Sequence, residues 1–124
     1  MNKSVLITGT SSGIGLETAL CRARQGFRVY ATMRDLEKRH SLEKAAEGHG
    51  AALRILELDV TKPETIEKTV GSIVQETGGI YGLVNNAGIA VHSYFEDLSS
   101  REIHHVFQTN VFGTMEVTRA VLPT

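Results

Sequence analysis

The sequence predicts an α/β fold in which a parallel β-sheet is covered by helices on both faces. Short apolar runs rich in β-branched residues alternate along the chain with longer segments of helical periodicity, the pattern of strand–helix–strand units. The short runs are nearly continuous in apolar character, as is typical of strands buried on both faces. The 124 residues are about the size of one domain, and we expect residues 1–124 to form a single unit without repeats or linkers.

The first part of the chain contains two predicted strand–helix units. The runs SVLIT and RVYAT predict strands over Ser4–Thr8 and Arg28–Thr32. Helical periodicity extends from Ile14 to Gln25, after which Gly26 supplies a C-terminal cap. The segment from Asp35 to Glu47 is rich in Leu, Glu, Lys and Ala, and it predicts a polar surface helix.

Two further units complete the alternation. A third strand is predicted over Ala52–Leu58, and a helix follows from about Glu64 to Thr77 with Thr61 as its N-cap. The run IYGLVN predicts a fourth strand over Ile80–Asn85, and a long last helix begins at Ser99 or Ser100 and ends near Leu122. Right-handed crossovers place the first strand centrally. The order of elements is that of a Rossmann-like, doubly wound parallel sheet in three α/β/α layers, ending after the fourth strand and its helix.

The composition excludes several classes of function. Thirteen Lys and Arg residues against fourteen Asp and Glu residues give a net charge of −1, which provides no electrostatic reason to expect nucleic acid as a partner. No apolar run is long enough to span a membrane. The five histidines show no metal-ligand spacing, so no metal site is predicted. Cys21 is the only cysteine, and we expect it to be a small buried hydrophobe in a reduced, cytoplasmic protein.

A glycine-rich loop follows the first predicted strand. Gly9, Gly13 and Gly15 stand where parallel strands present their carboxyl ends to helix N-termini, which is where α/β sheets bind ligands. Glycine permits positive φ and close approach of a phosphate, and the free N–H groups of the next helix favour an anion. Ser11 and Ser12 add hydroxyl donors. The loop therefore predicts a pyrophosphate site; a tight turn without a ligand is the alternative.

Four motifs in this order resemble the short-chain dehydrogenase/reductase family. They are TGTSSGIG at 8–15, DVT at 59–61, NNAG at 85–88 and TN at 109–110. The segment VYATMRD at 29–35 is most similar to the branch that contains hydroxysteroid and retinol dehydrogenases. The resemblance implies an oxidoreductase that transfers a hydride between a nicotinamide cofactor and an apolar secondary alcohol or ketone.

The resemblance also implies a set of cofactor-binding residues. They are Gly9, Ser11, Ser12, Gly13, Ile14, Gly15, Arg34, Asp59, Val60, Asn86, Ala87 and Gly88. The position at which an acidic residue would select NAD falls on the neutral Met33, and Arg34 beside it can bind a 2′-phosphate. We therefore expect NADP(H) to be favoured, with NAD(H) possible, and we expect Asp35 to point toward the next helix.

Asn110 is the candidate catalytic residue. It falls within an apolar stripe of the last predicted helix, where an amide must be hydrogen-bonded or costs roughly 1–3 kcal/mol. By resemblance, Asn110 holds a water in a proton relay with a catalytic lysine. Asn85 is expected to be a structural brace.

The chain departs from the family in its catalytic motif. None of Tyr30, Tyr81 and Tyr94 has a lysine four residues later, so the family's Tyr-x-x-x-Lys pair is absent. We therefore expect the amino-terminal half of a longer enzyme, inactive alone, whose open fourth strand a second copy would cover in a homo-oligomer. The alternative is a catalytically silent dinucleotide-binding or interaction module. A methyltransferase is disfavoured, because Met33 provides no acid for a ribose.

Overall fold

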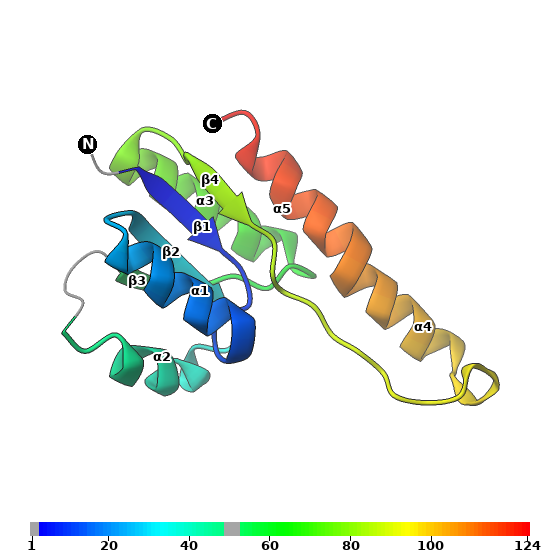
Figure 1. Cartoon of the computed structure of the whole chain (residues 1–124). Coiled ribbons are helices and arrows are strands. Elements are labelled where there is room, and N and C mark those ends of the chain that lie inside the picture. Colours follow the sequence, from blue (N-terminus) through cyan, green and yellow to red (C-terminus); the bar gives the residue numbers. More distant parts are fainter. Residues whose placement is uncertain (1–2, 49–52) are drawn as a thin grey trace.

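The computed structural model describes residues 3–48 and 53–124 and contains one four-stranded parallel sheet. Its strands are β1 (Ser4–Ile7), β2 (Arg28–Met33), β3 (Leu53–Glu57) and β4 (Gly82–Val84). They lie side by side in the order β3-β2-β1-β4 (Figure 1). The predicted central place of the first strand is confirmed. Ala52, the predicted first residue of the third strand, lies outside the described residues, and the fourth strand is shorter than predicted.

Helices cover both faces of the sheet, as the near-continuous apolar strands predict. The α-helices are α1 (Gly13–Arg24), α2 (His40–Ala45), α3 (Pro63–Thr77), α4 (Ser100–Phe107) and α5 (Thr114–Val121). One buried cluster joins the sheet to α1 and α2, and the other joins it to α3 and α5. The fold is therefore the predicted three-layer, Rossmann-like α/β/α arrangement.

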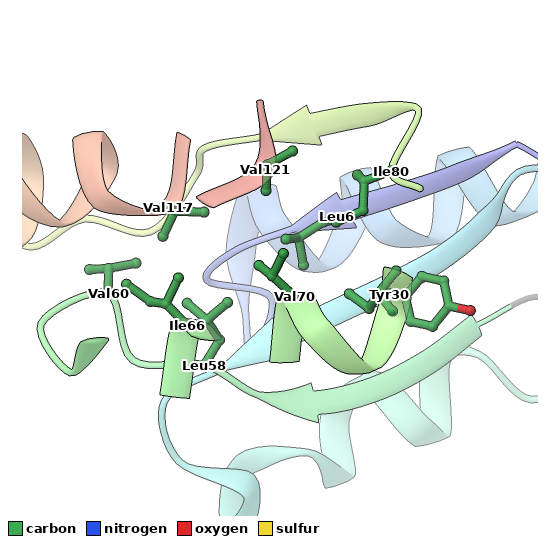
Figure 2. Close-up of a cluster of buried hydrophobic side chains, with 10 residues drawn as sticks. Leu6, Tyr30, Leu58, Val60, Ile66, Val70, Ile80, Val117 and Val121 are labelled. Carbon is green, nitrogen blue, oxygen red and sulfur yellow. The ribbon is translucent and has the colours of Figure 1, made fainter. Parts of the chain in front are cut away.

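The two clusters divide the side chains of β1 by their alternation along the strand. Val5 and Ile7 pack on the α1 side, whereas Leu6 packs on the α3 and α5 side. Figure 2 shows that Leu6 and Tyr30 of the sheet face a cluster of side chains from α3 and α5. These are Ile66 and Val70 of α3 and Val117 and Val121 of α5. Burial on both faces fixes the register of the central strands.

Three local predictions are wrong. The polar segment from Asp35 to Glu47 is not one helix but a 3₁₀ turn, η1 (Leu36–Lys38), followed by the short α2. The split arises because the Asp35 carboxylate accepts a hydrogen bond from Glu37 N at 3.0 Å and so starts a separate turn. The N-cap of α3 is Lys62, because the Thr61 hydroxyl donates to Asp59 instead. Cys21 is exposed, because it lies on the outer face of α1.

The last helix is interrupted by a π-helical segment, η4 (Gln108–Gly113), between α4 and α5. Ser99 is the N-cap of α4, and Ser99 and Glu102 form a capping box. Figure 1 shows the α4 end and the loop before it projecting away from the sheet, and this loop contains a 3₁₀ turn, η3 (Phe95–Asp97), that was not predicted. Of the expected apolar stripe, Phe107, Val111 and Met115 are exposed, and β4 pairs only with β1 among the described strands.

Candidate functional site

A cavity of about 390 Å³ lies at the carboxyl ends of the strands. The loops that follow all four strands contribute to it, as does the last helix. Its lining contains nine of the predicted cofactor-binding residues, namely Gly9, Ser11, Ser12, Arg34, Asp59, Val60, Asn86, Ala87 and Gly88. Residues that are more than seventy positions apart in the sequence thus meet at one end of the sheet, where open α/β sheets bind ligands.

The glycine loop combines an unusual backbone with an uncapped helix. Gly9 and Gly13 have φ values of +69° and +59°, in the left-handed region that favours glycine. The side chain of Ser12, the N-cap of α1, makes no capping hydrogen bond, and no acidic residue lies in the first turn of this helix. Each of the other described α-helices has a glutamate in its first turn. The positive end of α1 is therefore left uncompensated by the chain, which favours an anion.

The glycine loop and the segment after β4 are joined directly. The Thr8 hydroxyl, which is buried, accepts hydrogen bonds from Asn86 N at 3.1 Å and Ala87 N at 3.0 Å. The Asn86 side-chain amide donates to Gly9 O at 2.9 Å. These bonds hold two walls of the cavity at a fixed separation, so its shape is determined by the chain before any ligand binds.

The end of β2 supplies two charged side chains that bear on the choice of cofactor. Met33 is buried against the α1 side of the sheet, while Arg34 and Asp35 both line the cavity. The Asp35 carboxylate accepts from Glu37 N, as the N-cap of η1, so the expectation that it points toward the next helix is confirmed. Arg34 makes no ion pair or side-chain hydrogen bond within the described part of the chain.

The loop after β3 is folded on its own hydrogen bonds. Asp59 accepts from Thr61 N at 2.9 Å and from the Thr61 hydroxyl at 2.6 Å. Val60 is buried and packs closely on Gly113, where an added Cβ would lie 2.6 Å from a Val60 methyl carbon. The last helix therefore packs against the loop after β3, which lines the cavity. The π-helical segment has no room for a side chain at position 113.

Four predicted site residues are absent from the cavity lining, namely Gly13, Ile14, Gly15 and Asn110. Ile14 is 79% exposed. Asn110 accepts from Ile89 N at 2.8 Å and donates to Ile89 O at 2.7 Å, so its amide is hydrogen-bonded as the sequence required. Its side chain thereby ties the last helix to the loop after β4. Asn85 donates to the Thr118 hydroxyl at 2.9 Å, which ties the same loop to α5.

Several lining residues were not predicted as site residues. They are Met33, Asp35, Lys38, Leu58, Thr61, Ile89, His105 and Thr109. The four-residue spacing of His105 and Thr109 on one helix is the signal that places them on the same side. Within residues 3–48 and 53–124, no group of three or more His, Cys, Asp or Glu side chains could hold a metal ion. No helix in these ranges is long and apolar enough to cross a bilayer.

A comparison with protein families shows to which family the chain belongs. The family model described as short chain dehydrogenase matches residues 3–124. The chain belongs to the short chain dehydrogenase family. Among curated relatives of this family, the chain is 44% identical to retinol dehydrogenase 8 of Bos taurus over 125 residues, which covers 98% of this chain and 39% of the relative. The chain thus spans less than half the length of that short chain dehydrogenase.

Solved structures of this family share the fold. The chain is similar to the actinorhodin polyketide ketoreductase variant F189W solved with NADPH, at 32% identity and a TM-score of 0.90, over 98% of this chain and 46% of that one. It is also similar to ElxO solved with NADP bound, at 30% identity and a TM-score of 0.91, over 99% of this chain and 50% of that one.

Proposed function

We propose that this chain is the cofactor-binding part of an NADP(H)-dependent oxidoreductase that acts on an apolar secondary alcohol or ketone. The observation that carries the proposal is the cavity at the carboxyl ends of the strands, bounded by an uncapped helix N-terminus and by the free Arg34. The solved relatives that bind NADP or NADPH support the cofactor, and the resemblance to a retinol dehydrogenase supports an apolar substrate.

The residues present fit a nicotinamide dinucleotide. The cavity extends from the glycine loop past Arg34 to the loops after β3 and β4, which suits a ligand with a diphosphate between two nucleosides. At Gly9 an added Cβ would lie 2.8 Å from Ala87 Cα, so no side chain fits between the walls. When bound, the cofactor would supply a hydride donor or acceptor.

Each wall of the cavity has a proposed part in binding. The N–H groups at the start of α1 and the hydroxyls of Ser11 and Ser12 hold the diphosphate, which also places Gly13, Ile14 and Gly15 in the binding loop. Asp59 and Val60 contact the adenine, and the segment from Asn86 to Gly88 borders a ribose. Asn110 holds a water in the proton relay, while its side chain keeps the loop at Ile89 in place.

The choice of cofactor rests on Arg34. A carboxylate next to the ribose hydroxyls selects NAD, whereas a cation selects the 2′-phosphate of NADP. Asp35 is engaged with the backbone of η1, and Met33 is apolar, whereas the Arg34 guanidinium is free for the ribose. Its guanidinium can donate two parallel hydrogen bonds to a phosphate.

A titration of the full-length gene product with NADP⁺ and NAD⁺ tests the proposal. NADP⁺ is expected to bind more tightly, and Arg34→Gln is expected to reduce that preference by about tenfold. Arg101→Gln is the matched control, because Arg101 is an exposed arginine of α4 that does not line the cavity. Equal binding of the two cofactors would refute the NADP(H) preference, and binding of neither would refute the dinucleotide site.

An activity measurement separates the enzyme from the silent module that the sequence left open. Full-length protein that binds NADP⁺ but oxidises no apolar alcohol and reduces no ketone or aldehyde would favour the silent module. The exposed Phe107, Val111 and Met115 and the edge of β4 support our expectation of a homo-oligomer. A monomer in light scattering would refute that expectation.

A further inference from the structure

An aromatic ring from the last helix borders the cavity. Among the described residues that line the cavity, His105 is the only one with an aromatic side chain. Its ring makes no hydrogen bond or ion pair within residues 3–48 and 53–124. The neighbouring His104, in contrast, donates from Nδ1 to Ser100 O at 2.7 Å. The His105 ring is therefore available to a ligand.

Residues spaced by four along the last helix show where this ring lies. At Gly113 an added Cβ would lie 2.6 Å from a Val60 methyl carbon, so the helix packs tightly there on the loop after β3. Thr109, four residues earlier, is buried and lines the cavity. His105, four residues earlier again, is exposed and still lines it. Figure 1 shows this helix leaving the sheet toward its α4 end, so His105 borders the outer end of the cavity.

The loop after β3 gives this end of the cavity an apolar lining. Leu58 and Val60 both line it and are buried. The Asp59 carboxylate between them accepts hydrogen bonds from Thr61 N and from the Thr61 hydroxyl. Every nucleobase has a π-face that stacks on aromatic side chains, histidine included. Apolar side chains and one aromatic ring at the same end of a cavity therefore suit a flat nucleobase.

We propose that the imidazole ring of His105 stacks on the adenine of the dinucleotide and covers it at the outer end of the cavity. This inference rests on the proposed function, because it assigns one more contact to the same ligand. A stacked ring interacts with the base and not with a phosphate. His105 therefore contributes equally to the binding of NADP⁺ and NAD⁺, unlike the choice between them, which rests on Arg34.

The test titrates variants of the full-length gene product with NADP⁺, NAD⁺ and 5′-AMP. His105→Ala is expected to weaken all three by roughly five- to tenfold, since a base that loses its aromatic partner loses affinity on this scale. Alanine is the best helix former, so α4 should be retained. His105→Phe is expected to keep binding within about twofold, because it keeps a flat ring. His104→Ala is the matched control, because His104 is an exposed histidine of α4 that does not line the cavity.

Nuclear magnetic resonance gives a second readout that does not depend on a variant. Adenine that stacks on an imidazole shifts the signals of the ring protons through its ring current. Addition of 5′-AMP to the parent protein should therefore shift the ring-proton signals of His105 and leave those of His104 in place.

Each other outcome would overturn the inference. If His105→Ala leaves the binding of NADP⁺ and 5′-AMP unchanged while the parent protein binds both, the inference is wrong and the proposed function stands. A loss confined to NADP⁺ would show that His105 contacts a phosphate instead of the base. A loss that His105→Phe does not restore would show that the ring nitrogens are needed and that stacking is not the contact. If the parent protein binds neither dinucleotide, the proposed function fails and the inference fails with it.

Discussion

Gly15→Ala tests the close approach on which the cavity depends. Gly15 lies in the first turn of α1, and a Cβ built on it would lie 2.1 Å from Gly9 O and 2.4 Å from Asn86 Nδ2. Separations below 3.0 Å are essentially never found for real Cβ atoms, so the Gly9 carbonyl or the start of α1 must move by nearly an ångström. This movement would also break the bond from Asn86 to Gly9 O.

The expected loss of stability follows from three contributions. Overpacking of this kind costs about 1–3 kcal/mol, and the lost hydrogen bond costs about 1 kcal/mol. Alanine returns about 1 kcal/mol, because it is the better residue in a helix. The free energy of unfolding should therefore fall by roughly 1–3 kcal/mol, and NADP⁺ binding should weaken by about tenfold or more, because Gly9 and Asn86 both line the cavity.

Urea denaturation of the full-length gene product measures this change, and Gly71→Ala is its matched control. Gly71 is an exposed glycine inside α3, and a Cβ there would meet nothing within 4 Å. This control should raise the free energy of unfolding by about 0.5–1 kcal/mol. If Gly15→Ala behaves like Gly71→Ala, the two backbone segments do not approach as closely as the structure shows, and the reasoning fails.

Three further predictions concern single side chains. Thr8→Val should lower the free energy of unfolding by about 2–4 kcal/mol in urea denaturation, because two backbone N–H groups lose their acceptor, whereas Thr8→Ser should retain most of it. Tyr30→Phe should leave stability at neutral pH unchanged or raise it by up to about 1 kcal/mol, because the buried hydroxyl has no partner among the described residues. Burial raises the pKa of the Tyr30 hydroxyl, so the parent protein should lose stability in thermal melts above about pH 10. A Tyr30→Phe variant that loses as much stability over the same pH range would refute this prediction. The Ser99 backbone N–H donates to the Glu102 carboxylate and lowers the pKa of this group. The start of α4 should therefore fray as the pH falls below about 4.3, and amide hydrogen exchange would detect the fraying. Glu102→Gln should abolish this dependence on pH.

The alternation of strands and helices could be predicted because it is a matter of periodicity and burial. Each strand is buried on both faces or packed on two clusters, so a short apolar run identifies it without knowledge of its neighbours. The second helix could not be predicted in this way. Its composition favours a helix throughout, but one hydrogen bond from Glu37 N to the Asp35 carboxylate starts a separate 3₁₀ turn. Average propensity does not contain such a bond.

The site residues that directly follow strands could be predicted from the sequence. The site residues that only the tertiary fold brings to the cavity could not. Arg34, Asp59 and Asn86 come directly after strands, whose carboxyl ends meet at one edge of the sheet. Lys38 lies beyond an unpredicted turn, and His105 lies on a helix that is distant from the loops in the sequence. No local pattern states that these side chains border the same cavity.

The glycines of the first loop also show why one motif can encode several physical requirements. Gly13 has a positive φ and open space around it, so the backbone conformation alone calls for glycine there. Gly15 lies in a regular helix, and what excludes a side chain is the carbonyl oxygen of Gly9. Gly9 is subject to both requirements, since its φ is positive and a Cβ would meet Ala87. The spacing of the motif therefore reflects the packing of two backbone segments as much as the binding of a phosphate. The chain needs glycine at these positions to fold, whether or not a ligand is bound.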